Sequence, residues 1–301
     1  MSLHEKPPKK SVAIRLIPIG FAGLILLVTV LLQGNDVRLL NPAGRIASEQ
    51  RHLLIVSTLV LLVIAIPTLT LFYFTAWKYR DTSRKAPYNP NINQSKKLIF
   101  TIWAAPFAIM IILASIMWPA THRLAPQKHI DNGVKPLTVQ VIAMRWKWLF
   151  IYPEQNIATV NYVQIPVDTP VRFEITADET PMSSFWIPHL GGQLYAMTGH
   201  TNLLNLIAEE KGDFEGSTAE INGAGFAGMK FIARASTLED FNTWVGETKS
   251  SSLILDDMEY KKLLVPSENN QMAVYSEANP DIYNAMLIKY MGSQNQHTGH
   301  K

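Results

Sequence analysis

The sequence predicts a membrane α plus all-β protein, with a transmembrane helical hairpin, an extra N-terminal hydrophobic segment, a β-sandwich and a short helical C-terminal region. Two observations lead to this fold class. Long apolar blocks without charged residues fill much of the first 118 residues, and short alternating apolar runs follow from about residue 134. Long uncharged blocks are typical of membrane spans, whereas short alternation between turn residues is typical of β-strands.

Two of the apolar blocks, residues 53–77 and 98–118, are predicted to cross the membrane as a hairpin within 50–120. Each is close to the roughly 20 residues that a helix needs to cross about 30 Å of hydrocarbon. An earlier block, residues 16–32, follows a basic N-terminus and has the form of both a cleavable signal peptide and a short anchor. Both interpretations stay open for this signal or anchor segment, which we place at 1–35.

Lysine and arginine are distributed unevenly around these blocks. The N-terminus carries four basic residues through Arg15, the loop 78–97 carries six, and the loop 33–52 carries three. The positive-inside rule then places the N-terminus and the loop 78–97 in the cytoplasm. Everything after Trp118 is therefore predicted to lie outside.

The alternating runs between residues 130 and 235 predict an antiparallel β-sandwich. They read LTVQVIA, YVQIP, TPVRFEIT, LLNLIA, FEGSTAEI and MKFIARA. A capping box of Ser236 with Glu239 then predicts a helix that ends at Val245. Further helices are expected at 256–265 and 281–291, so that a helical extension occupies 236–292 and a polar tail 293–301.

The chain contains no cysteine. This composition excludes disulfides, iron–sulfur clusters, thiolate nucleophiles and blue-copper sites. The stretch GAGFAG at 223–228 matches the dinucleotide fingerprint G-x-G-x-x-G, but the MKFIARA run after it predicts a strand where that fingerprint needs a helix. No other catalytic pattern occurs, so we expect no catalytic residue on this chain and no nucleic-acid partner.

Four separated stretches resemble subunit II of the haem-copper respiratory oxidases, the cytochrome c oxidase subunit II superfamily. They are AWKYR at 76–80, MRWKWLFIYPEQNIATVN at 144–161, FWIPHLGGQLYAMTG at 185–199 and GAGFAGMKF at 223–231. Within that family they look like the quinol-oxidising branch, the bo-type ubiquinol oxidases. The resemblance covers nearly the whole chain and implies a cupredoxin-like fold for the sandwich.

In the cytochrome c branch of this family, two loops hold a dinuclear copper centre. The resemblance places its six ligand positions on Ser183, Thr218, Glu220, Asn222, Phe226 and Met229. Only the glutamate and the methionine match, and both bridging cysteines are replaced. Because neutral hydroxyl and amide groups cannot substitute for thiolates, the resemblance implies a vestigial copper site that binds no metal.

Three further site positions follow from the resemblance. Trp146 and Trp148 look like the electron-entry aromatic patch of the copper-bearing branch, and without copper we expect them to act as packing residues. Positive charge on the neighbouring Arg145 and Lys147 is expected to repel a basic cytochrome c. The family's glutamate at the mouth of a proton channel, four residues before the tryptophan of a W-x-x-P pattern, corresponds to Ile99.

The resemblance implies a non-catalytic subunit II of a proton-pumping ubiquinol:oxygen oxidoreductase, a terminal oxidase of aerobic respiration. This chain would carry no cofactor, since haems, copper and the ubiquinol site belong to subunit I in the family. It would brace subunit I with its hairpin and cap it on the periplasmic side of the bacterial inner membrane. The expected partners are subunit I, the other subunits and the lipid bilayer, but not cytochrome c.

The alternative is a free-standing, membrane-tethered cupredoxin-like protein with a binding or assembly role. A tether needs only one span, whereas the predicted hairpin has two, with Pro67 and Pro106 inside them. Prolines within spans are tolerated where neighbouring helices satisfy the freed backbone groups. The hairpin therefore favours a chain that packs against other membrane helices.

Overall fold

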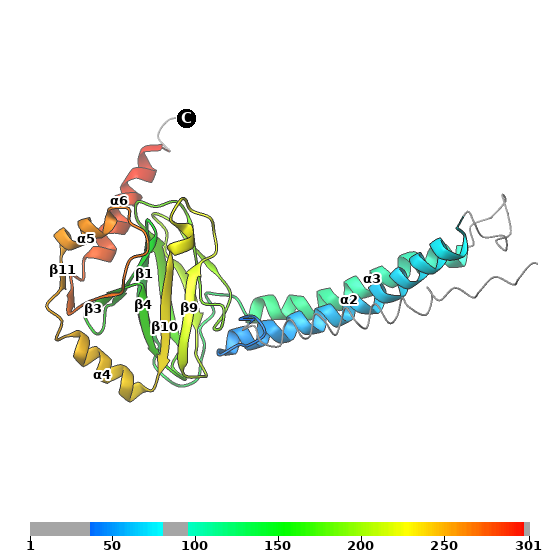
Figure 1. The fold of residues 1–301 in the computed structure, drawn as a ribbon, viewed down its shortest axis with the longest axis horizontal. Coiled ribbons are helices and arrows are strands. Elements are labelled where there is room, and N and C mark those ends of the chain that lie inside the picture. Colours follow the sequence, from blue (N-terminus) through cyan, green and yellow to red (C-terminus); the bar gives the residue numbers. More distant parts are fainter. Residues whose placement is uncertain (1–36, 81–95, 298–301) are drawn as a thin grey trace, which may run out of the picture. The chain divides into compact units, whose positions relative to one another are not determined.

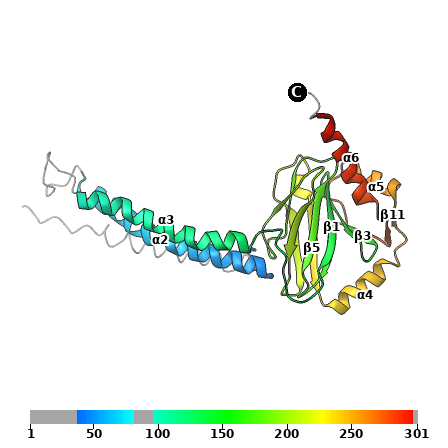
Figure 2. The ribbon, with the colours of Figure 1, turned by 180° about the vertical axis from the view of Figure 1, so that it is seen from behind.

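The computed structural model describes residues 37–80 and 96–297 (Figures 1 and 2). The apolar block 16–32, most of the loop 78–97 and the end of the polar tail lie outside the described residues. The chain divides into two compact units, 1–41 and 42–301. The helices and strands described below belong to the second unit.

Two long helices form the predicted hairpin, α2 (Arg45–Lys78) and α3 (Lys96–Arg123). Both are long and apolar enough to cross a membrane. Large apolar side chains such as Phe72, Trp103 and Trp118 are exposed along them. A helix that exposes apolar residues over most of its surface is stable in lipid or against other membrane helices, so the hairpin is confirmed in length and composition.

The strands form a sandwich of two sheets. The first sheet has the order β12-β3-β2-β1-β5-β8, and the second has the order β4-β10-β9-β6-β7. The first comprises β1 (Leu137–Met144), β2 (Lys147–Tyr152), β3 (Ile157–Val160), β5 (Val171–Ala177), β8 (Asn202–Leu206) and β12 (Ala273–Tyr275). The second comprises β4 (Tyr162–Pro166), β6 (Ser183–Trp186), β7 (Leu194–Ala196), β9 (Gly212–Thr218) and β10 (Lys230–Ser236).

The sheets are mixed, which corrects the expectation of a purely antiparallel sandwich. Strands β1 and β5 run parallel side by side (Figure 2), and so do β4 and β10. The cause is a change of sheet between β3 and β4, where only Asn161 separates the strands and adopts a left-handed φ of 54°. Because the chain leaves the first sheet at this corner and returns as β5, sequence neighbours do not pair there.

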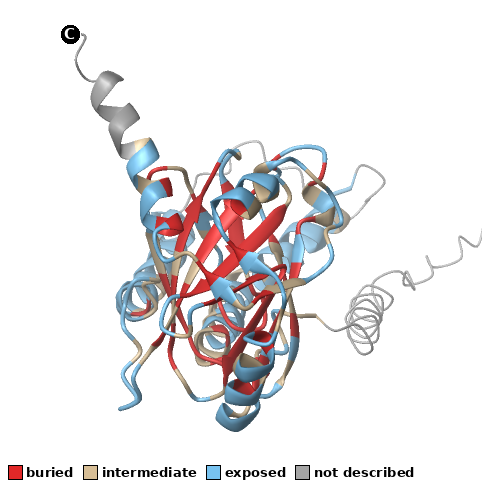
Figure 3. Ribbon diagram, turned by 90° about the vertical axis from the view of Figure 1, so that its left-hand side faces the viewer, coloured by how far each residue is buried: buried red, intermediate tan, exposed pale blue. Residues whose placement is uncertain are grey.

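An aromatic cluster fills the space between the sheets. The rings of Phe185 and Phe231 stack with centroids 5.1 Å apart, and Trp148 meets Phe185 edge-on at 5.3 Å. Figure 3 shows the buried residues concentrated on the strands. Gly216 on β9 lies beneath the Phe231 ring, so close that an added Cβ would stand 2.1 Å from the ring.

The C-terminal region covers the outer face of the first sheet. It contains α4 (Leu238–Thr248), β11 (Ile254–Leu255), α5 (Asp257–Leu264), β13 (Glu277–Ala278) and α6 (Ile282–His297), together with β12, which pairs with β3. A second hydrophobic cluster joins this region to the sheet, with Ile142 and Leu149 on the strands and Tyr260 and Tyr283 on the helices. Both faces of β2 are therefore covered, which explains why all its residues are buried.

The helices of this region differ from the sequence prediction in detail. The cap of α4 is Thr237, not Ser236, and its hydroxyl accepts a hydrogen bond from the Asp240 amide. The helix cap thus lies one residue later than predicted, because Ser236 completes strand β10, and the Thr237 hydroxyl also donates to the Asp240 carboxylate. The helix expected at 256–265 is α5, and the helix expected at 281–291 continues to His297.

We predict that Gly216→Ala destabilises the protein, because its Cβ would clash with the Phe231 ring in the core. Overpacking of this kind costs about 1–3 kcal/mol. Gly246→Ala in α4 is the matched control, since an added Cβ there meets no atom within 4 Å and alanine stabilises a helix by up to about 1 kcal/mol. Thermal unfolding of the detergent-solubilised chain measures both, and equal melting temperatures for the two variants would contradict the packing.

Candidate functional site

Two loops at one end of the sandwich carry the predicted site positions. One loop leads from β5 into β6 and ends at Ser183, and the other joins β9 to β10 and contains GAGFAG. The glycine loop holds one 3₁₀ turn, Phe226–Gly228, and is followed directly by the strand β10. A strand in place of a helix removes the amide cluster that would bind a pyrophosphate, so the prediction of a loop between two strands is confirmed.

A buried hydrogen-bond cluster occupies the centre of the two loops. The Asn222 side-chain amide donates to Ser183 Oγ over 2.8 Å and to Met229 Sδ over 3.1 Å. All three side chains are buried. The amide of Asn222 therefore connects the two loops through its own donors.

The remaining predicted positions surround this cluster. The Thr218 hydroxyl accepts from the Ser184 amide over 3.2 Å and donates to the Glu220 carbonyl over 3.3 Å. The Phe226 carbonyl accepts from the Met229 amide over 3.2 Å. The structure thus brings together the positions Ser183, Thr218, Glu220, Asn222, Phe226 and Met229.

The donors at these positions do not suit copper. They are hydroxyls, an amide, backbone carbonyls and one thioether, whereas a dinuclear copper centre needs thiolate and imidazole ligands. Within residues 37–80 and 96–297 there is no group of three or more His, Cys, Asp or Glu side chains that would hold a metal ion. The arrangement is a neutral hydrogen-bond cluster.

The glycines of the loop allow it to lie against Trp146. An added Cβ on Gly225 would stand 2.3 Å from the indole, and one on Gly223 would stand 3.3 Å from it. Trp146 itself adopts a left-handed φ of 64° in the turn between β1 and β2. Trp148, in contrast, is fully buried in the core between the sheets. The two tryptophans therefore occupy different environments.

Lys147 does not contribute to the protein surface, which corrects the expectation of a repulsive positive pair. Its side chain is buried, and Nζ donates to the carbonyls of Leu263 and Val265, both at 2.9 Å. These carbonyls terminate helix α5, where a cation is favourable. Burial lowers the pKa of Lys147. Arg145 remains exposed and donates to the Glu179 carbonyl over 2.9 Å.

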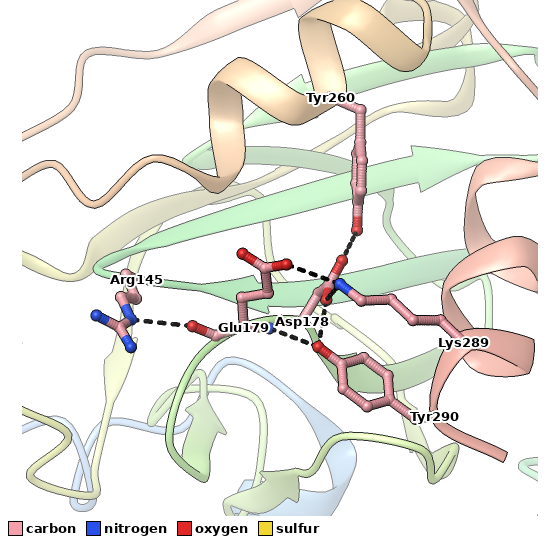
Figure 4. A network of polar contacts seen from close by, with 6 residues as sticks. All are labelled: Arg145, Asp178, Glu179, Tyr260, Lys289 and Tyr290. Atoms are coloured by element: carbon pink, nitrogen blue, oxygen red, sulfur yellow. Dashed lines mark hydrogen bonds and ion pairs between the residues drawn. The ribbon is translucent and has the colours of Figure 1, made fainter. Parts of the chain in front are cut away.

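A network around Asp178 joins the loop between β5 and β6 to the C-terminal region (Figure 4). The buried Asp178 carboxylate accepts from the Tyr260 hydroxyl at 2.7 Å and the Tyr290 hydroxyl at 2.6 Å, and it lies 3.2 Å from Lys289 Nζ. Lys289 also pairs with Glu179 at 2.8 Å. Sequence reasoning missed this network, because Asp178 and Glu179 lie more than eighty positions before their partners in the C-terminal region and form no motif with them.

Electrostatic interactions keep Tyr260 and Lys289 protonated, so that both act as hydrogen-bond donors. Burial raises the pKa of Tyr260, and the hydrogen bond to Asp178 raises it further. Burial alone would lower the pKa of Lys289, but its hydrogen bonds to Glu179 and Asp178 outweigh that effect and raise it. The tyrosine therefore keeps its proton and the lysine its charge at neutral pH.

The C-terminal region also touches the glycine loop. Asn269, in the segment between α5 and β12, lies close to Gly228. A Cβ added to Gly228 would stand 2.7 Å from the Asn269 side-chain oxygen. The Asn161 amide donates to the Asn270 carbonyl over 3.0 Å and holds the same segment. Both loops of the site are consequently braced from the C-terminal side.

Comparison with known proteins agrees with this architecture. Residues 154–236 match the family described as cytochrome C oxidase subunit II, periplasmic domain, and residues 249–294 match the COX aromatic rich motif. The chain is 45% identical over 281 residues to the cytochrome bo(3) ubiquinol oxidase subunit 2 of Pseudomonas putida, covering 93% of this chain and 89% of that one. It is 42% identical to the ubiquinol oxidase subunit 2 of Acetobacter aceti, covering 87% and 85%.

We predict that Tyr260→Phe loosens the C-terminal region, since it removes a hydrogen bond to the buried Asp178 carboxylate. Such bonds to charged groups contribute about 1.5–3 kcal/mol. Because the folded-state pKa of Tyr260 lies above its unfolded value of 10.0, this stabilisation is complete below about pH 10 and declines as the pH rises further. Unfolding of the wild type and the variant at neutral and alkaline pH measures it.

Tyr195→Phe is the control, because Tyr195 is a partly exposed tyrosine of β7. We expect it to change the unfolding free energy by less than about 0.5 kcal/mol. A Tyr260→Phe protein as stable as this control at pH 7 would show that the network does not hold the region in place.

Proposed function

The chain belongs to the quinol oxidase subunit 2 family, and on that premise we propose that it is the non-catalytic subunit II of a proton-pumping ubiquinol:oxygen oxidoreductase. Sequence similarity over nearly the whole length of ubiquinol oxidase subunits is the observation that carries the proposal. The neutral cluster at Asn222 supports it, since its donors suit no copper relay. Electrons from a membrane quinol need no such relay on this chain.

We further propose that the haems, the copper and the ubiquinol site belong to subunit I, and that Ser183, Thr218, Glu220, Asn222, Phe226 and Met229 are vestiges of a copper site. Trp146 and Trp148 then serve packing alone. Trp148 lies in edge-on contact with Phe185 and Phe231, and Trp146 supports the glycine loop. Neither role requires electron transfer.

The proposed location is the bacterial inner membrane, with the sandwich on the periplasmic side. The hairpin would contact both the bilayer and subunit I. Exposed aromatic side chains at Phe100, Trp103 and Trp118 support this, since they leave a large apolar surface on α3 to be covered. Neither cytochrome c nor nucleic acid is a partner in this proposal.

Purification of the tagged chain from its native membranes tests the assignment. We expect haem-containing subunits to copurify, with a haem absorption spectrum and ubiquinol-dependent oxygen uptake. A chain that purifies alone, without haem or oxidase activity, would instead support the free-standing membrane-tethered protein.

We also propose that Ile99 stands at the mouth of a proton channel of subunit I, where the family carries a glutamate. Ile99 lies in the first turn of α3 and is partly exposed. Its side chain cannot relay a proton, so protons must enter there through subunit I groups or water. Lys96 and Lys97 would repel protons rather than collect them.

We therefore expect Ile99→Ala to leave turnover of the oxidase nearly unchanged, and Ile99→Glu to leave unchanged or accelerate the reduction of the oxygen-binding site. Stopped-flow measurement of haem reduction decides this, with Ile102→Ala on the same helix as the control. A contradictory result would be an Ile99→Ala variant that slows this reduction about tenfold or more in an intact complex. Such a rate change raises the activation free energy by about 1.4 kcal/mol and would show that Ile99 itself shapes the channel mouth.

A further inference from the structure

A cavity of about 260 Å³ lies where α2 begins and α3 ends. Its wall is formed by the first turns of α2, by the segment 123–131 that follows α3, by Gly192 and Gln193, and by β8. Neither the glycine loop nor the Asp178 network contributes to it. It is therefore separate from the site described above.

The wall of this cavity is fixed to the sandwich on both sides. The Pro126 carbonyl accepts from the backbone amide of Asn205 at 2.9 Å and from its side-chain amide at 3.1 Å, which holds the segment after α3 on β8. The His189 carbonyl accepts from the Ala43 and Gly44 amides at 2.8 and 3.1 Å and holds the start of α2. Hydrogen bonds of the fold therefore define the position of both walls of the cavity.

Three cationic side chains line the cavity, Arg45, Arg123 and Lys128, against two acidic ones, Glu49 and Asp131. Arg45 pairs with Glu209 at 3.1 Å and Arg123 with Glu49 at 2.9 Å, in both cases through Nε. A guanidinium group has five N–H donors, so these pairs leave the terminal nitrogens of both arginines available. The Lys128 amine has no acceptor among the residues that the structure describes.

The rest of the lining is apolar and includes Ile46, Leu124, Ile130 and Leu204. Cationic donors beside an apolar wall match a ligand with an anionic head and a hydrocarbon body. Membrane phospholipids have this chemistry, and the cavity lies at the ends of the two candidate membrane spans. Trp118, exposed near the end of α3, is placed as an interfacial aromatic would be.

We propose that this cavity binds the phosphate headgroup of an anionic phospholipid from the outer leaflet. The inference rests on the proposed function only in taking α2 and α3 as membrane spans. The volume lies below the roughly 300–1,000 Å³ of sites that enclose a whole drug-sized ligand. It therefore suits a headgroup whose acyl chains stay in the bilayer. Arginine is well matched to this ligand, because its planar fork binds phosphate oxygens in pairs.

The bound headgroup would join the hairpin to the sandwich. Arg45 belongs to α2, Arg123 to α3, and Lys128 to the segment held on β8 by Pro126. A single phosphate contacted from these three places fixes the external domain against the membrane surface.

The test uses the complete oxidase, delipidated in detergent and followed by native mass spectrometry during titration with phosphatidylglycerol. We expect Lys128→Gln to weaken binding about fivefold, in line with the roughly 1 kcal/mol that one basic residue contributes near an anionic lipid surface. Arg123→Gln should weaken it as well. Lys135→Gln is the control, since Lys135 is an exposed lysine outside the cavity that pairs with Glu154.

Phosphatidylcholine and inorganic phosphate form the comparison arms. Equal binding of phosphatidylcholine, or equal binding by Lys128→Gln and Lys135→Gln, would overturn the site. Displacement of phosphatidylglycerol by inorganic phosphate at equal concentration would show a free-phosphate site in place of a lipid site. Haem content and oxygen uptake, recorded on the same samples, test the proposed function separately, so failure of one assignment is distinguishable from failure of the other.

Discussion

The approach of Gly225 to the Trp146 indole is the contact on which this end of the sandwich depends. No side chain fits between the loop backbone and the ring, so the loop can lie flat only where glycine stands. In that position Asn222 reaches Ser183 on one side and Met229 on the other. The cluster that joins the two loops therefore depends on the absence of a side chain at Gly225.

The C-terminal region also holds this end of the sandwich in place, because it covers the outer face of the first sheet and contacts both loops. Lys147 shows how closely the two parts are joined. Its charge is buried against the carbonyls at the end of α5, and removal of those carbonyls would leave an unpaired buried cation, which is costly. Asp178 is bound in the same way by donors from α5 and α6. The region is therefore a structural part of the sandwich.

The hairpin and most strands could be predicted from the sequence because their apolar periods are local properties. The parallel pairing of β1 with β5 could not, since it depends on a change of sheet at Asn161. The burial of Lys147 could not be predicted either, because a lysine between two tryptophans has no local sign of burial. The Asp178 network also lacked a signal, as its partners meet only after the C-terminal region has folded back. The resemblance alone assigns copper-ligand positions to the two loops, and the structure joins several of these positions by hydrogen bonds.

The loop cluster links the two loops through side-chain hydrogen bonds. Two loops held by a metal ion lose their link when the ion leaves, because its ligands are then buried polar groups without partners. Here the link consists of the Asn222 side-chain nitrogen, which donates to the Ser183 hydroxyl and the Met229 thioether. The buried Asn222 Oδ1 has no hydrogen-bond partner among the described residues, and an unpaired buried acceptor of this kind costs about 1–3 kcal/mol. The contacts of Asn269 and Tyr290 with the two loops add support from outside the cluster. Side chains of the chain itself thus link the two loops at this end of the sandwich.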